Sequence, residues 1–207
     1  MLLNWGPFLW MRCYSNGAQF LDQVVGTGAD WAALEKAARA VPPGSNGTEV
    51  LPFVLAEPSI GVNAPRVEWH PQKPSDPGTL VRASFEAIAY LIGLAVREHE
   101  AAGQSITRIS VSGGIARSDL MLEILASVLG RPLERLVSSE GTALGAAVVA
   151  LAGLETHLRR KQGINEPFTA ADAVTMMVKF RSPVQPNPEW TATYRAGLDR
   201  FAARVRG

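Results

Sequence analysis

Residues 111–119 read VSGGIARSD, in which a short apolar run ends at two adjacent glycines and a polar Ser–Asp pair then begins a helical pattern. A strand that ends in glycines before a helix exposes N–H groups without a Cβ, so a phosphate or a ribose can approach the backbone. A tight turn that needs a positive φ explains the same glycines without any ligand. Spacing alone leaves both interpretations open and favours the turn.

The glycine pair differs from the two most familiar phosphate-binding loops. Arg117 and Ser118 occupy the region where GxGxxG would place its third glycine, which disfavours a dinucleotide-binding fold. The chain also contains no GxxxxGK[ST] loop, which excludes a Walker-type phosphate clamp.

The segments on both sides of the pair predict an α/β fold. In chain order we expect a helix from Asp76, a β-branched strand at 106–112, a helix at 118–129, a strand at 131–138 and a small-residue helix at 142–154. The order helix, strand, glycine pair, helix, strand, helix is typical of a parallel strand pair.

Other patterns predict the remaining elements. In chain order these are a helix at 14–25, a helix capped by Asp30, a buried strand at 50–56, a long proline-rich loop at 57–78, a capping box from Thr169 to Asp172, and a terminal helix segment at 183–207 that starts at Asn187.

The second strand–helix junction reads SSEGTALGAA (138–147). Glu140 precedes a helix N-terminus, where a carboxylate is stabilised, and we expect it to orient the loop or cap the helix rather than act as a general base. Thr142 is the expected N-cap. Gly145 and its small neighbours predict close packing against another element.

Composition and charge narrow the class of protein. The 207 residues are 47% hydrophobic with a net charge of +1, which suits a globular domain and excludes a disordered chain. The nearly equal numbers of basic and acidic residues argue against a nucleic-acid partner. The single cysteine, Cys13, excludes an internal disulfide, and the three scattered histidines lack the spacing of a metal site. No uninterrupted apolar run reaches the roughly 18 residues of a membrane span, so we expect no membrane partner.

The first residues, MLLNWGPFLWM (1–11), are apolar but lack the basic leader of a signal peptide. They suggest the middle of a segment rather than a natural start. We expect residues 1–12 to be a former interior segment that is exposed here and favours association into a homodimer.

The stretch 108–154 resembles the second signature of the FGGY carbohydrate kinases, the xylulokinase, glycerol kinase and gluconate kinase group of the actin-like ATPase superfamily. The residues that carry the resemblance are Gly113, Gly114, Ser118, Ile124–Ala126, Gly130, Glu140 and Ala143–Ala147. Weaker matches are the helix RA-x-x-E-x-I-A at 82–89 and the Gly17-led helix before it.

The resemblance implies one ribonuclease H-like (actin-like ATPase) domain over residues 1–207, with a mixed sheet flanked by helices, forming an incomplete second domain of a cytoplasmic ATP-dependent sugar kinase. It implies that Gly113, Gly114, Ile115 and Ser118 hold the adenosine part of ATP, with Gly17 as a further contact. A sugar or polyol would bind through the missing N-terminal domain, which would also supply the Mg²⁺ ligands.

The departures from the family pattern concern catalysis. No DxGT phosphate hairpin lies near the N-terminus, and no G-D-x-x-A segment carries a catalytic Asp. The resemblance therefore assigns no catalytic residue to this chain, and we expect the chain alone to be inactive. The alternative is a non-catalytic actin-like module that binds a ligand or a partner.

Overall fold

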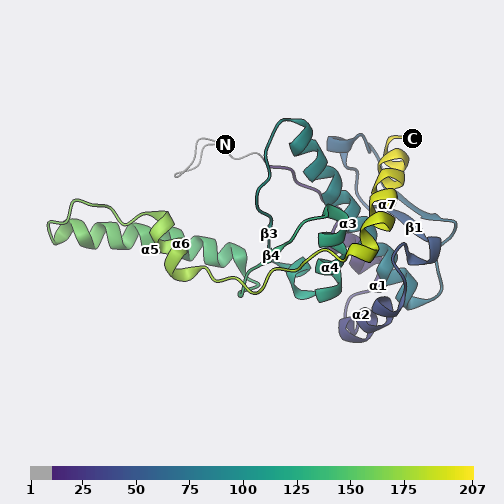
Figure 1. Cartoon of the computed structure of the whole chain (residues 1–207), viewed down its shortest axis with the longest axis horizontal. Coiled ribbons are helices and arrows are strands. Elements are labelled where there is room, and N and C mark those ends of the chain that lie inside the picture. Colours follow the sequence, from purple (N-terminus) through teal and green to yellow (C-terminus); the bar gives the residue numbers. More distant parts are fainter. Residues whose placement is uncertain (1–10) are drawn as a thin grey trace. The chain divides into compact units, whose positions relative to one another are not determined.

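The computed structural model describes residues 11–207 (Figure 1), so most of the apolar segment at 1–12 lies outside the described residues. The described chain forms two compact units. Unit 1 consists of Met11, Ile109–Arg117 and Glu134–Pro183; unit 2 consists of Arg12–Arg108, Ser118–Leu133 and Val184–Gly207.

The elements alternate between helices and short strands. In chain order they are α1 (Ala18–Val25), α2 (Trp31–Ala40), η1 (Ser45–Gly47), β1 (Glu49–Phe53), η2 (Pro58–Ile60), β2 (Arg66–His70), α3 (Pro77–Ala101), β3 (Ser110–Val111), η3 (Gly114–Arg117), α4 (Asp119–Leu129), β4 (Glu134–Arg135), α5 (Gly141–Lys161), α6 (Ala170–Met177) and α7 (Pro188–Arg206).

The predicted helix starts at Asp30, Asp76, Ser118, Thr169 and Asn187 are confirmed. Each of these side chains accepts a hydrogen bond from a backbone N–H of the first turn, and the Thr169–Asp172 capping box is complete. Such caps satisfy donors that have no partner inside the helix, so a local pattern is enough to predict them.

Helix α3 forms the centre of unit 2 (Figure 1), where it packs against α2, α4, α7 and β1. Most of its first 18 residues are buried, including Val81, Phe85 and Ala89. A helix that is apolar on nearly all sides is typical of a core helix, because neighbours cover every face.

The segment 57–78 is not the plain loop that its prolines predict. Strand β2 lies inside it and pairs antiparallel with β1, from Glu49 opposite His70 to Phe53 opposite Arg66. Sequence analysis missed β2 because its residues, RVEWH, are mostly polar and half-buried, so they carry little apolar periodicity.

Unit 1 contains the parallel pair that the sequence predicts, but its strands are short. β3 and β4 pair through Ser110 with Glu134 and Val111 with Arg135. The strands expected at 106–112 and 131–138 are therefore two residues each. An isolated antiparallel bridge joins Leu136 to Phe180 beside β4, so the strand pairing in this unit is mixed.

Two expectations about α5 are wrong. Its N-cap is Glu140 rather than Thr142, because the helix begins at Gly141, two residues before the start that a Thr142 cap implies. Gly145 is exposed, and a Cβ placed there would meet no atom within 4 Å. Ala143 and Ala146 are exposed as well, so this small-residue stretch of α5 does not pack closely within the described residues.

By length and composition alone, α3 and α5 could each cross a membrane, with mean hydropathies of 1.5 and 1.3 over 18 residues. The sequence-based expectation considered only uninterrupted apolar runs and missed both. Burial separates the two helices, since 72% of the α3 window is buried but only 6% of the α5 window. The apolarity of α3 is that of a core helix.

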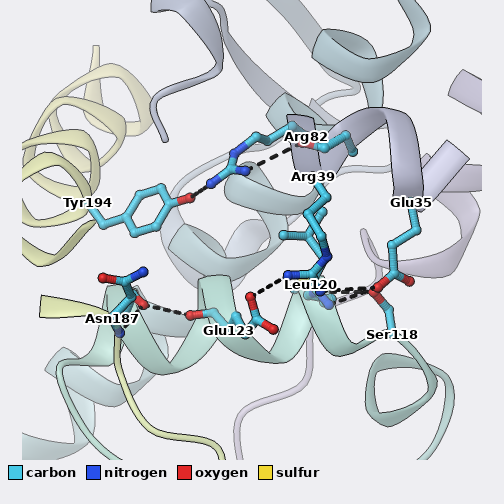
Figure 2. A network of polar contacts seen from close by, with 11 residues as sticks. Glu35, Arg39, Arg82, Ser118, Leu120, Glu123, Asn187 and Tyr194 are labelled. Carbon is cyan, nitrogen blue, oxygen red and sulfur yellow. Dashed lines mark hydrogen bonds and ion pairs between the residues drawn. The ribbon is translucent and has the colours of Figure 1, made fainter. Parts of the chain in front are cut away.

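The RA-x-x-E motif of α3 forms a buried polar network in unit 2. The Glu86 carboxylate accepts hydrogen bonds from Arg82 Nε at 3.2 Å and from the Tyr194 hydroxyl at 3.0 Å, and Arg82 also donates to that hydroxyl at 2.7 Å (Figure 2 labels Arg82 and Tyr194). All three residues are at most 2% exposed. Burial raises the pKa of Glu86, although its hydrogen bonds from Ser45 and the charge of Arg82 act in the opposite direction.

The same carboxylate holds the turn before β1. It accepts hydrogen bonds from Gly44 N at 2.9 Å and from Ser45 Oγ at 2.8 Å. Ser45 and Asn46 have φ values of 50° and 54°, a left-handed conformation that costs free energy for residues other than glycine. Glu86 therefore stabilises a turn that is locally unfavourable.

Candidate functional site

The glycine pair of unit 1 lies where β3 ends, and its first member is required by the turn. Gly113 has φ of +79°, its N–H donates to Ser139 O at 3.0 Å, and its carbonyl accepts from Ala116 N at 3.1 Å. A side chain at Gly113 would be strained in this conformation. The tight-turn interpretation is therefore sufficient for Gly113.

The turn does not explain Gly114. This residue begins η3, its φ lies outside the left-handed region, and a Cβ built on it would meet no atom within 4 Å. Gly114 is exposed, and Ile115, the next residue, is half-buried. The fold would accept a side chain at Gly114, so the bare backbone there has no structural reason within the described residues.

Glu140 lies at the start of α5 in the same unit. Its carboxylate accepts hydrogen bonds from Ser139 Oγ at 3.0 Å and from the Arg117 guanidinium at 2.9 Å, and these two partners lower its pKa. A carboxylate held ionised by two donors is a poor proton acceptor at neutral pH. These contacts suit an orienting role for Glu140.

Ser118 belongs to unit 2, where it caps α4. Its Oγ accepts a hydrogen bond from Met121 N at 3.0 Å, which leaves the hydroxyl hydrogen available as a donor. The N–H of Leu120, one residue before Met121 in the same turn, donates to Glu35 Oε1 on α2 at 2.9 Å (Figure 2).

Gly17, also in unit 2, is the N-cap of α1, and a Cβ there would meet no atom within 4 Å. The preceding residue fixes it in place. Asn16 is fully buried, exchanges two hydrogen bonds with the backbone of Leu55, and donates to the Glu57 carboxylate at 2.9 Å. Sequence analysis missed Asn16 and Glu57, because their contact spans 41 residues of chain without a local signal.

The structure thus brings Gly113, Gly114 and Ile115 together in one turn of unit 1. Ser118 and Gly17 occupy the N-terminal ends of α4 and α1 in unit 2. Their roles in binding a nucleotide stay predictions.

One segment matches a phosphate-binding motif in letters only. Asp76–Thr79 reads D-P-G-T, but it is the beginning of α3, where Asp76 accepts hydrogen bonds from the Thr79 N–H and hydroxyl, both at 2.7 Å. Gly78 is buried, and a Cβ there would lie 2.7 Å from Ala37 O. This D-P-G-T is a helix cap rather than a phosphate hairpin.

No group of three or more metal-binding side chains occurs within residues 11–207. His70 and Glu68 lie close together as a pair of side chains, with His70 Nε2 3.7 Å from a Glu68 carboxylate oxygen.

A family model decides the relationship. The model of the FGGY family of carbohydrate kinases, C-terminal domain, matches residues 15–154. The chain belongs to this family. The match includes Gly17 and residues 113–118. It also includes Arg82 and Glu86 of the RA-x-x-E motif on α3.

Sequence relatives agree with this assignment. The chain is similar to the glycerol kinase of Symbiobacterium thermophilum, with 30% identity over 189 residues that cover 86% of this chain and 34% of the relative. It is 43% identical over 72 residues to the glycerol kinase of Dechloromonas aromatica, which covers 34% of this chain and 14% of that protein. The chain therefore spans about a third of the length of such relatives or less.

Solved structures of FGGY kinases share the fold. The xylulose kinase of Rhodospirillum rubrum matches 91% of this chain and 36% of its own, with a TM-score of 0.71 and 26% identity. The ligand-bound xylulose kinase of Lactobacillus acidophilus matches 92% of this chain and 38% of its own, with a TM-score of 0.72 and 19% identity. The predicted actin-like ATPase fold, as part of a larger kinase, is confirmed.

Proposed function

We propose that this chain is the ATP-binding part of a carbohydrate kinase that transfers the γ-phosphate of ATP to a hydroxyl group of a sugar or polyol. Within the chain, the proposed nucleotide contacts are Gly113, Gly114, Ile115, Ser118 and Gly17. Membership of the FGGY family supports ATP as the phosphate donor. A cytoplasmic location and a sugar or polyol substrate, as in relatives of the xylulose and glycerol kinase type, are part of the same proposal.

The observation that carries the proposal is the bare backbone of Gly114. The turn needs a glycine at 113 but not at 114, where the chain could hold a side chain without a clash. A nucleotide that lies against the backbone would require that side chain to be absent. In unit 2, the hydroxyl hydrogen of Ser118 could donate a hydrogen bond to an uncharged part of a nucleotide.

The chemistry of the intact kinase needs groups that we do not assign to this chain. Phosphoryl transfer requires a base for the acceptor hydroxyl, Mg²⁺, and donors to the γ-phosphate held in line. Bound ATP supplies the phosphoryl group. We propose that the base and the Mg²⁺ ligands lie outside these 207 residues, and that this part of the kinase binds and orients the nucleotide.

The substitution Gly114→Val is expected to weaken ATP binding by at least about tenfold, which corresponds to about 1.4 kcal/mol. The valine side chain would occupy the space proposed for the nucleotide, while the fold has room for it. Calorimetric titration of ATP into the purified wild-type chain and the variant measures the change.

Gly153→Val is the matched control, since a Cβ at Gly153 on α5 also meets no atom within 4 Å. This variant should bind ATP as the wild type does. A folded Gly114→Val variant with unchanged affinity would remove Gly114 from the proposed site.

The purified chain is expected to show no sugar kinase activity. The reason is that the base and the metal ligands are proposed to lie elsewhere in the intact enzyme. A coupled assay that follows ADP release from ATP, with a panel of pentoses, hexoses and polyols, tests this. Turnover of any of these substrates above the buffer control would show that the catalytic groups are present in the chain.

A further inference from the structure

The N-terminal end of α4 already holds a carboxylate from another helix of unit 2. Glu35 on α2 accepts the Leu120 N–H at 2.9 Å, while Ser118 accepts the Met121 N–H at 3.0 Å (Figure 2). The Glu35 side chain is 25% exposed. The N–H groups of this helix end that would bind an external anion are thus partly occupied by groups of the protein itself.

The charges around this helix end also disfavour a second anion. Asp119 lies in the first turn of α4 and directly precedes Leu120, whose N–H donates to the Glu35 carboxylate. Arg39, a cation on α2, pairs with Glu123 at 2.7 Å and lies 3.8 Å from Glu35. A helix N-terminus normally attracts phosphate through its N–H groups and the helix dipole. A carboxylate at the same place accepts a hydrogen bond from one of those N–H groups, offsets the positive potential and repels a further negative charge.

We infer that Glu35 is a positioning and specificity residue of the proposed nucleotide site. Its carboxylate holds the first turn of α4, and with it Ser118, in position through the hydrogen bond from Leu120. Its negative charge repels phosphate, so this helix end would bind the uncharged nucleoside part of the ligand. The inference rests on the proposed function, since it assumes that Ser118 contacts a nucleotide.

The two roles of Glu35 depend on different properties of its side chain. Holding Leu120 needs a hydrogen-bond acceptor, which glutamine also provides through its carbonyl oxygen. Repelling phosphate needs the negative charge, which glutamine lacks. The variant Glu35→Gln therefore separates charge from positioning, and Glu35→Ala removes both.

The test is a titration of the full chain with adenosine and, separately, with inorganic phosphate. The backbone amide signals of Leu120 and Met121 in ¹⁵N NMR spectra report binding at this helix end. Glu123→Gln is the matched control, because it makes the same chemical change at the other carboxylate that pairs with Arg39, on α4 but away from its N-terminus.

For Glu35→Gln we expect adenosine affinity within about twofold of wild type and phosphate affinity at Leu120 raised by about two- to fivefold, the range of charge effects at helix ends. For Glu35→Ala we expect the gain in phosphate affinity together with a loss of about fivefold in adenosine affinity, as for a lost helix cap. Glu123→Gln should change neither.

Two results would overturn the inference while leaving the proposed function intact. One is unchanged phosphate affinity in Glu35→Gln while the wild type binds adenosine. The other is an equal gain in Glu123→Gln, which would trace the effect to the α2–α4 contact in general. If the wild-type chain bound neither adenosine nor ATP, the proposed function would fail, and this inference with it.

Discussion

Replacing Glu86 by alanine is expected to lower the free energy of unfolding of unit 2 by about 3–5 kcal/mol, the usual cost of removing one partner from a buried ion pair. The substitution would leave Arg82 charged and 1% exposed, without its carboxylate. It would also take the acceptor away from Gly44 N and Ser45 Oγ in the left-handed turn. Urea unfolding followed by circular dichroism measures the loss, which would remove most of the stability of a protein at the low end of the usual range of about 5–15 kcal/mol.

The control for this prediction is Glu123→Ala, which breaks an exposed pair with Arg39. That change should cost at most about 1 kcal/mol, as exposed ion pairs do. Should Glu86→Ala prove too unstable to purify, Glu86→Gln keeps an acceptor and is expected to fall between wild type and alanine. A loss below about 1 kcal/mol in Glu86→Ala would mean that the network contributes little to stability.

Gly197→Ala is expected to destabilise the protein by about 2–3 kcal/mol, although the same change in an exposed helix interior normally stabilises by roughly 1 kcal/mol. A Cβ at this position of α7 would lie 2.1 Å from the Tyr90 hydroxyl oxygen and 2.7 Å from Tyr90 Cζ. Tyr90 is 5% exposed on α3, so it has little room to move. Thermal unfolding of the variant should show a lower midpoint.

Two further variants test the cause of this effect. Gly153→Ala on α5 has open space around its Cβ and should raise the stability or leave it unchanged. Adding Tyr90→Phe to Gly197→Ala removes the nearest oxygen and should recover part of the loss. If Gly197→Ala were as stable as wild type, α7 would have to pack against α3 less closely than the structure shows.

The parts of the fold that sequence predicts well depend on neighbours in the chain. Asp76 caps the helix that begins at the next residue, and Thr169 pairs with a residue three positions away. The side-chain type and the spacing are both visible in the sequence. The parallel pair β3–β4 was predictable for the same reason, from its place between two helices.

The parts that sequence missed depend on contacts between distant segments. Strand β2 exists because β1 pairs with it, and its own residues are too polar to indicate a strand. Glu35 contacts a backbone N–H 85 residues away, which no local pattern can show. For the candidate site, the sequence could mark Gly113 and Gly114 as a pair, but only the backbone angles distinguish the glycine that the turn needs from the one that it does not.

The Glu86–Tyr194 hydrogen bond joins residues that are 108 positions apart, and this has a consequence for synthesis on the ribosome. At about 5–20 residues per second, α7 leaves the ribosome roughly 5–20 seconds after α3. During that interval Glu86 and Arg82 lack the tyrosine that later covers them, and the apolar surface of α3 that faces α7 stays open to other chains and to chaperones. Completion of unit 2 must therefore follow translation of α7 and cannot proceed strictly from the N-terminus onward.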